Sequence, residues 1–156
     1  MSVSINNSPV HSDSIITQEY GVVTGGACGY HTGVDIAPYG DTSPHPFLYP
    51  VFSGEVVQVN LDSSQALGLY VTIRDTLNRY WRYCHMSFID FFVTVGTQVT
   101  PNGYIGRMGD TGNTSGIHLH LECSTTLAWD CSTFINPCTE LGIPNVDNTV
   151  IEYSRI

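Results

Sequence analysis

The 156-residue sequence contains no lysine, and its only basic residues are five arginines, against fourteen acidic residues, for a formal net charge of −9. A surface of this sign repels nucleic acid and anionic lipid, so we expect neither as a partner. The sequence also has no run of about 20 apolar residues, and its opening residues hold neither a basic segment nor an apolar stretch. We therefore expect no membrane span and no signal peptide.

Amphipathic helices are scarce as well, since no segment of ten or more residues follows a helical period and only 87–92 is predicted to form a helical turn. Strands are predicted instead, because β-branched and aromatic runs alternate with glycine, proline and short polar breaks. The break at 75–78 predicts an antiparallel hairpin between its flanking strands. The expected strands are 54–59, 69–74, 79–84, 93–95, 98–99 and 104–108. The predicted fold class is mainly β.

The length fits a single domain that buries roughly 70% of the surface of its unfolded chain. We expect residues 1–156 to form one domain with a motif-bearing core at about 15–138. Residues 1–13 are polar and are expected to be a loose leader, and 139–156 a closing tail.

Five cysteines form an odd number, which does not fit the even disulfide framework of a small secreted scaffold. Most of them are expected to be small buried apolar residues. Two bridges stay open from the sequence, Cys123 to Cys131 or Cys131 to Cys138.

The segment 117–123 alternates between two kinds of side chain, as a strand with one apolar face does. Its polar face would carry His118, His120 and Glu122, with the two imidazoles about 7 Å apart because each residue advances about 3.3 Å. Both imidazoles can then reach one small site. Glu122 would either accept the second N–H of a metal-bound imidazole or simply end the strand at the rim.

His31 and Asp35 lie four residues apart in a segment that contains glycine and precedes a proline, so a loop or strand carries them. Together with an imidazole from the distant strand they make an N, O, N set that suits Zn²⁺ with one open coordination position. A structural site that combines Cys28 with His31 is a weaker alternative. His11 and His45 lie outside any cluster and are interpreted as surface or loop residues.

Three motifs in order resemble the lysostaphin/LytM-type zinc metallopeptidases: His31-x-x-x-Asp35, then Tyr-Cys-His-Met-Ser at 83–87, then Gly-Asp-Thr-Gly-Asn-Thr-Ser-Gly-Ile-His-Leu-His-Leu-Glu at 109–122. The resemblance runs from about residue 21 to 137. It implies a single-domain antiparallel β-sheet fold with long loops that wall a groove. It also implies an endopeptidase that binds one zinc ion and cuts peptide bonds in the stem or cross-bridge of bacterial peptidoglycan.

Carried over residue by residue, the resemblance implies that His31, Asp35 and His120 bind zinc, and that His85 and His118 are the catalytic pair that does not bind the metal. The sequence departs from the family pattern at Cys84, where the family often has a small residue, and in an apparent insertion at 43–49. A tyrosine before the first ligand assists in some members. Only Tyr20 and Tyr30 are near, so this role is left unassigned.

The groove walls are expected in the loops between strands, with aromatic side chains that either face the substrate or pack locally. The expected loops are 38–49, 60–68 and 124–134, and the aromatic residues are Tyr39, Phe47, Tyr49 and Trp129.

With its acidic charge and no visible signal peptide, the chain resembles phage-encoded lysins. These are either endolysins or the lytic part of a larger tail protein or assembly. Delivery by a phage particle or release on host lysis would then bring the enzyme to the wall. One alternative is an inactive wall-binding or activator module of the same fold, which the presence of all five site residues disfavours. Another is a carboxypeptidase with a related zinc site, for which the spacing between His31 and Asp35 is too short.

Overall fold

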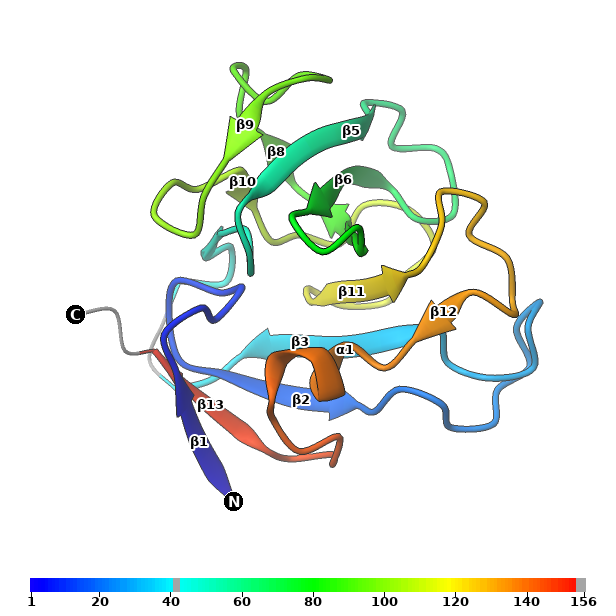
Figure 1. Ribbon diagram of the computed structural model, residues 1–156. Helices are drawn as coiled ribbons and strands as arrows, with labels where there is room; N and C mark the ends of the chain where they lie inside the picture. Colours follow the sequence, from blue (N-terminus) through cyan, green and yellow to red (C-terminus); the bar gives the residue numbers. More distant parts are fainter. Residues whose placement is uncertain (41–42, 154–156) are drawn as a thin grey trace.

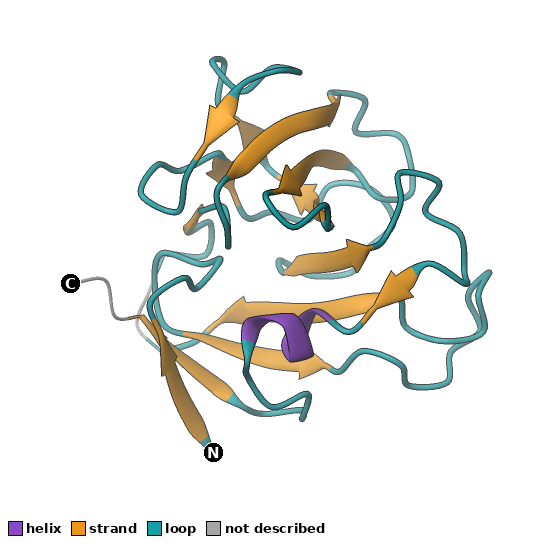
Figure 2. Ribbon diagram, viewed as in Figure 1, coloured by secondary structure: helices purple, strands orange, loops and turns teal. Residues whose placement is uncertain are grey.

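Strands dominate the computed structural model, which describes residues 1–40 and 43–153 (Figures 1 and 2). The mainly β prediction is confirmed. The strands of the described residues are β1 (Ser2–Ile5), β2 (Ser14–Gln18), β3 (Gly33–Pro38), β4 (Phe47–Leu48), β5 (Gly54–Asn60), β6 (Leu69–Asp75), β7 (Tyr80–Met86), β8 (Phe88–Ile89), β9 (Gln98–Val99), β10 (Gly106–Arg107), β11 (Leu119–Ser124), β12 (Phe134–Ile135) and β13 (Val150–Tyr153), and one short helix, α1, spans Pro137–Leu141.

A large sheet has the strand order β1-β13-β2-β3-β11-β7-β6-β5-β9, with β12 paired to β11, and a small sheet has the order β4-β10-β8. The pair β1 and β13 is parallel, and the other pairs are antiparallel. The predicted hairpin is confirmed as β6 and β7. Strand β11 lies between β3 and β7, so the motifs at 31–35, 83–87 and 118–122 meet in the middle of the large sheet.

The alternation along β11 places its two faces in different surroundings. Leu119, Leu121 and Cys123 are fully buried in the hydrophobic core, whereas His120 and Glu122 point to the opposite side of the sheet. Gly33 on β3 pairs with Glu122, and a Cβ there would collide with the carbonyl of Leu121 and press on both polar side chains. The residue at position 33 must therefore be glycine for β3 to approach β11 this closely.

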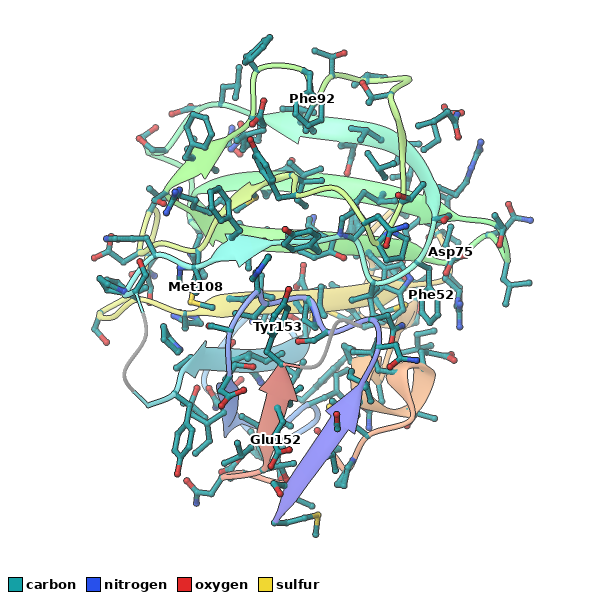
Figure 3. The ribbon with its side chains drawn as sticks, turned by 90° about the vertical axis from the view of Figure 1, so that its left-hand side faces the viewer. Phe52, Asp75, Phe92, Met108, Glu152 and Tyr153 are labelled. Atoms are coloured by element: carbon teal, nitrogen blue, oxygen red, sulfur yellow. A yellow bond between two sulfur atoms is a disulfide. The ribbon has the colours of Figure 1, made fainter. Side chains whose placement is uncertain are left out.

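The first residues of the chain are part of the fold, so the expectation of a loose leader at 1–13 was wrong. Strand β1 pairs with β13, and the two lie side by side in Figure 3. Val3 and Ile5 pack against the core, and Val10 is fully buried. The spaced apolar residues of this polar segment thus bury enough surface to hold it. Residues 154–156 of the expected tail lie outside the described residues.

Two smaller secondary-structure predictions were wrong. Phe88–Ile89 is strand β8 rather than a helical turn, because it pairs with β10, and 93–95 does not form a strand. The short helix α1 lies elsewhere: the Asn136 side chain accepts the backbone N–H of Cys138 at 2.9 Å, and Gly142 ends the helix at φ 70°. A helix this short has too few turns to produce a detectable period in the sequence.

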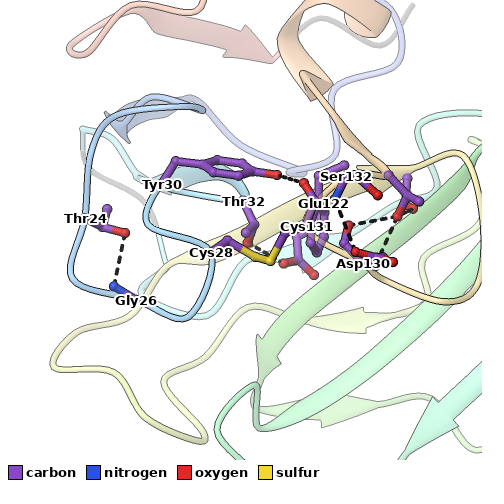
Figure 4. The surroundings of a disulfide bond; sticks show 12 residues. Thr24, Gly26, Cys28, Tyr30, Thr32, Glu122, Asp130, Cys131 and Ser132 are labelled. Carbon is purple, nitrogen blue, oxygen red and sulfur yellow. Dashed lines mark hydrogen bonds between the residues drawn. A yellow bond between two sulfur atoms is a disulfide. The ribbon is translucent and has the colours of Figure 1, made fainter.

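A disulfide joins Cys28 to Cys131, which are 103 residues apart in the sequence (Figure 4). Neither of the two bridges considered from the sequence, Cys123 to Cys131 or Cys131 to Cys138, is therefore formed. Cys84, Cys123 and Cys138 are buried free thiols, which confirms that most of the cysteines are small buried residues. The bridge ties the loop before β3 to the loop after β11, beside the site described next.

Candidate metal centre and active site

Three predicted ligands converge at the junction of β3 and β11. Asp35 and His120 are direct partners in the register of these strands, and His31 lies in the turn that leads into β3. One ligand atom from each of the three lies within 4.8 Å of the other two. The Oδ1 atom of Asp35 is 2.8 Å from Nδ1 of His120 and 3.2 Å from Nε2 of His31.

The second nitrogen of each candidate ligand imidazole, in His31 and His120, already has a partner. Nδ1 of His31 is 2.9 Å from the carbonyl of Glu19, so this nitrogen carries the proton and Nε2 faces Asp35. Nε2 of His120 is 3.2 Å from Oε2 of Glu122, which leaves Nδ1 for the cluster. Of the two roles open for Glu122 from the sequence, the structure shows the contact with His120. Such partners fix the tautomer of a metal-binding imidazole, so these residues fit a zinc ion well.

The charges of the site favour a cation. Burial alone would raise the pKa of Asp35, but hydrogen bonds from His120 and His31 outweigh it and hold the pKa well below its usual range. Burial alone would lower the pKa of His120, but the hydrogen bonds to Asp35 and Glu122 raise it to about 9. The two ionised carboxylates that attract a proton to His120 would equally attract a divalent metal ion.

His118 and His85 lie beside this cluster, with their ring centroids 5.0 Å apart. Nδ1 of His118 is 2.9 Å from the carbonyl of Gly116, and Nδ1 of His85 is 2.7 Å from the carbonyl of Thr111. Each bond places a proton on Nδ1, so Nε2 is the nitrogen without a proton in the neutral form of each ring. Nε2 of His118 is 3.6 Å from Oδ1 of Asp35.

The backbone of His85 adopts φ 61°, a left-handed conformation that is uncommon for residues other than glycine. His85 lies where the register between β7 and β6 shifts, and its ring centroid is 5.0 Å from that of His118 and 6.1 Å from that of His120. Its backbone conformation is a local cost of the kind found at functional sites. Burial lowers the pKa of His85 below its ordinary value, against the opposing effect of the bond to Thr111. Burial therefore favours the neutral form of this ring.

All five site residues open into one cleft of about 580 Å³. Its walls come mainly from three loops with small side chains. Besides the site residues, the lining comprises Gly26, Ala27, Ala66, Leu67, Asn113, Thr114 and Ser115. Of the expected wall loops, 60–68 contributes, whereas the described residues of 38–49 and those of 124–134 do not line the cleft; residues 41 and 42 lie outside the described part of the chain.

Of the two alternatives left open for the loop aromatics, the structure shows local packing for three of the four residues. Phe47 and Tyr49 contact Tyr104, and Trp129 stacks against Arg82 at 3.9 Å. Tyr39 is exposed outside the cleft. A loop aromatic next to other aromatics or an arginine buries more of its surface by packing than by facing an open groove.

The two tyrosines before His31 bond to main-chain carbonyls. The hydroxyl of Tyr20 donates to Phe134 at 3.2 Å, and that of Tyr30 donates to Cys131 at 2.6 Å (Figure 4). Neither tyrosine lines the cleft. Tyr30 instead helps the disulfide to fasten its loop.

Sequence reasoning missed the loops 24–27 and 111–115, although the glycines of the third motif marked the second as a tight turn. It also missed Arg82, whose Nε donates to Glu122 at 2.6 Å. An arginine within an otherwise apolar and aromatic strand would have indicated a buried charged partner. Cys84, the departure from the family pattern, places its thiol 3.9 Å from the same carboxylate.

A family model, Peptidase family M23, matches residues 29–131, most of the chain. The chain therefore belongs to peptidase family M23, a family of metallopeptidases. The curated relatives that match in sequence include an uncharacterized metalloprotease of Buchnera aphidicola, 32% identical over 69% of this chain, and the peptidoglycan DD-endopeptidase ShyA of Vibrio cholerae, 36% identical over 59% of it. The aligned parts make up only 25% and 20% of those proteins.

Solved structures agree on the fold. The catalytic domain of lysostaphin from Staphylococcus simulans is 23% identical, with a TM-score of 0.64 over 85% of this chain and 92% of that one. The catalytic domain of the prophage-encoded M23 protein EnpA of Enterococcus faecalis, solved as a point mutant, is 28% identical, with a TM-score of 0.63 over 80% of this chain and 88% of that one. A zinc-containing peptidase from Vibrio cholerae is 26% identical, with a TM-score of 0.62 over 78% and 36%. The predicted lysostaphin/LytM fold is thus confirmed.

Proposed function

We propose that this chain is a zinc-dependent endopeptidase that hydrolyses peptide bonds in the stem or cross-bridge of bacterial peptidoglycan. The observation that carries the proposal is the meeting of five side chains in one cleft: the possible metal ligands His31, Asp35 and His120, beside His85 and His118. Membership of the M23 family and the likeness to a peptidoglycan endopeptidase support the substrate class.

The ligand set has two imidazoles and one carboxylate, which is the composition of catalytic zinc sites that keep a position open. Zinc, when bound there, supplies a Lewis acid that polarises the scissile carbonyl and activates water at neutral pH. The partly buried carboxylate of Asp35 lies 2.8 and 3.2 Å from the two imidazoles, so the three candidate ligand atoms already lie together.

The remaining work is proton transfer, which falls to His85 and His118. A proton must leave the attacking water and another must reach the departing amine, and imidazole suits both tasks because its reference pKa is near 6.5. Both rings are held by a main-chain carbonyl at Nδ1 and keep Nε2 for this exchange. We assign the roles of base and of donor to the developing oxyanion to this pair.

The cleft is open and its lining is small, so an extended peptide can enter it. Peptidoglycan purified from several walls and incubated with the enzyme tests the function. New internal amino groups, located by mass spectrometry of the fragments, are expected from an endopeptidase. Release of terminal D-alanine alone would indicate a carboxypeptidase, and intact peptidoglycan bound by the protein would indicate the inactive wall-binding or activator module.

We further propose a phage context, in which the enzyme acts on the wall after delivery by a phage particle or after release in a lysing host. A net charge of −9 gives it no electrostatic attraction to an anionic wall, and one structural relative is prophage-encoded. No helix of the described residues is long and apolar enough to span a membrane. Detection of the chain by mass spectrometry in purified virions would support a tail-associated lysin, and its presence only in lysates would support an endolysin.

A further inference from the structure

A buried carboxylate lies directly behind the candidate zinc site. Only 2% of Glu122 is exposed, and both of its oxygens have partners. Oε2 is 3.2 Å from Nε2 of His120 and accepts the hydroxyl of Thr32 at 2.7 Å (Figure 4). Oε1 accepts Nε of Arg82 at 2.6 Å and lies 3.9 Å from the thiol of Cys84.

Arg82 is itself held in place from several sides. Its guanidinium stacks on the ring of Trp129 at 3.9 Å and lies 5.5 Å from the ring of Tyr70. The indole N–H of Trp129 donates to Gln58 at 3.1 Å, and Trp129 belongs to the loop that the disulfide fastens at Cys131. A rigid support therefore extends from this loop through Arg82 to the carboxylate.

A buried ion pair alone is weak evidence for stability, because its desolvation offsets much of the attraction. This ion pair, however, contacts the one nitrogen of His120 that faces away from Asp35. An imidazole ligand whose second N–H is fixed by a carboxylate is held in one tautomer and one ring orientation, and losing such a partner typically costs 10–100-fold in metal affinity.

We propose that Glu122 is a positioning residue for zinc binding: it accepts the Nε2–H of His120, while Arg82 and Thr32 hold its carboxylate in place. The inference rests on the proposed function, since it assumes that His120 is a zinc ligand. It differs from the proposed function because it attributes the tightness of zinc binding to residues that do not touch the metal.

Zinc affinity of metal-free protein, measured by competition with a chromophoric chelator, tests this assignment. Glu122→Gln keeps the size of the side chain but cannot satisfy His120, Thr32 and Arg82 together, so the dissociation constant should rise roughly 10–100-fold. Thr32→Val removes one hydrogen bond to the carboxylate with little change of shape. It should raise the constant by roughly 2–10-fold, the worth of one hydrogen bond, and it serves if Glu122→Gln fails to fold.

The matched control is Asp75→Asn. Asp75 is also a buried carboxylate and also accepts an arginine Nε at 2.6 Å, from Arg79, but it lies outside the cleft. This variant should lose stability and keep wild-type zinc affinity. A second readout is the Nε2–H of His120 in nitrogen–proton spectra of the zinc-loaded protein, which should be slow to exchange in wild type and Asp75→Asn and fast in Glu122→Gln.

The outcomes separate the two proposals. If wild-type protein binds no zinc, the proposed function fails. If it binds zinc, and Glu122→Gln and Thr32→Val bind it as tightly as Asp75→Asn does, the positioning role is overturned while the proposed function stands.

Discussion

Removing the disulfide should weaken both the fold and the cleft. In the double variant Cys28→Ser with Cys131→Ser, the denatured chain regains the freedom of a closed loop that spans 103 residues. The chain-entropy relation gives about 4.7 kcal/mol for a loop of this length, and removal of native bridges typically costs about 2–5 kcal/mol. For a chain of this size each kcal/mol lowers Tm by roughly 2–4 °C, so we expect Tm to fall by roughly 4–20 °C.

The effect on activity follows from where the bridge lies. Cys28 fastens the loop that carries Gly26 and Ala27, two residues of the cleft lining. Peptide cleavage measured well below the Tm of the variant should therefore fall, although every site histidine is retained. Calorimetry and a cleavage assay on the same samples give both quantities.

Dithiothreitol supplies the control, since it should lower the Tm of wild type to that of the double variant and leave the variant unchanged. The three remaining thiols are buried, so the bridge is the sensitive group. The reasoning is refuted if mass spectrometry shows the bridge intact in wild type and yet the two proteins share the same Tm and the same activity.

Three further predictions follow from the site and its supports. His85→Ala and His118→Ala should each bind zinc normally and lose roughly 10²–10⁴-fold in kcat, as for general acid–base residues; full activity in either variant, with its metal measured, contradicts the assignment. Gly33→Ala should lower Tm and loosen zinc binding, because its Cβ collides with the carbonyl of Leu121; an unchanged denaturation curve would show that the strands can move apart. Burial alone would raise the pKa of Asp75, but hydrogen bonds from neighbouring backbone and side chains outweigh it and lower the pKa. The ionised carboxylate therefore stabilises the fold at neutral pH, and this stabilisation disappears as the pH falls through the folded-state pKa. Asp75→Asn should be less stable than wild type at pH 7 and approach the stability of wild type in acid, and a stability difference independent of pH would contradict this.

A feature of the site can be predicted from the sequence when it depends on neighbouring residues, and less well when it depends on residues far apart in the chain. The alternation at 117–123 is local, so the sequence alone placed His118 and His120 on one face of a strand. That this strand lies beside the one with Asp35 depends on sheet topology, which local patterns do not encode, and the resemblance to a family supplied it. The same limit explains the Cys28–Cys131 bridge, whose partners are distant in sequence.

The alternatives left open for the aromatic wall residues and the wrong expectation for the start of the chain have a different origin. An exposed aromatic and a packed aromatic look alike in a sequence, and Phe47 and Tyr49 found partners in Tyr104. The first residues look polar, yet β1 pairs with β13 through the main chain and its Val3 and Ile5 pack against the core. Pairing partners at opposite ends of a chain are the contacts that sequence patterns predict least well.

The most direct test of the account is the metal content of the purified protein, measured beside its activity on peptidoglycan for wild type and for His31→Ala and Asp35→Ala. We predict one zinc ion per wild-type chain, loss of zinc and activity together in both variants, and loss and recovery of wild-type activity with chelation and added zinc. Digestion of peptidoglycan by a sample without metal, or by either variant at the wild-type rate, would contradict it.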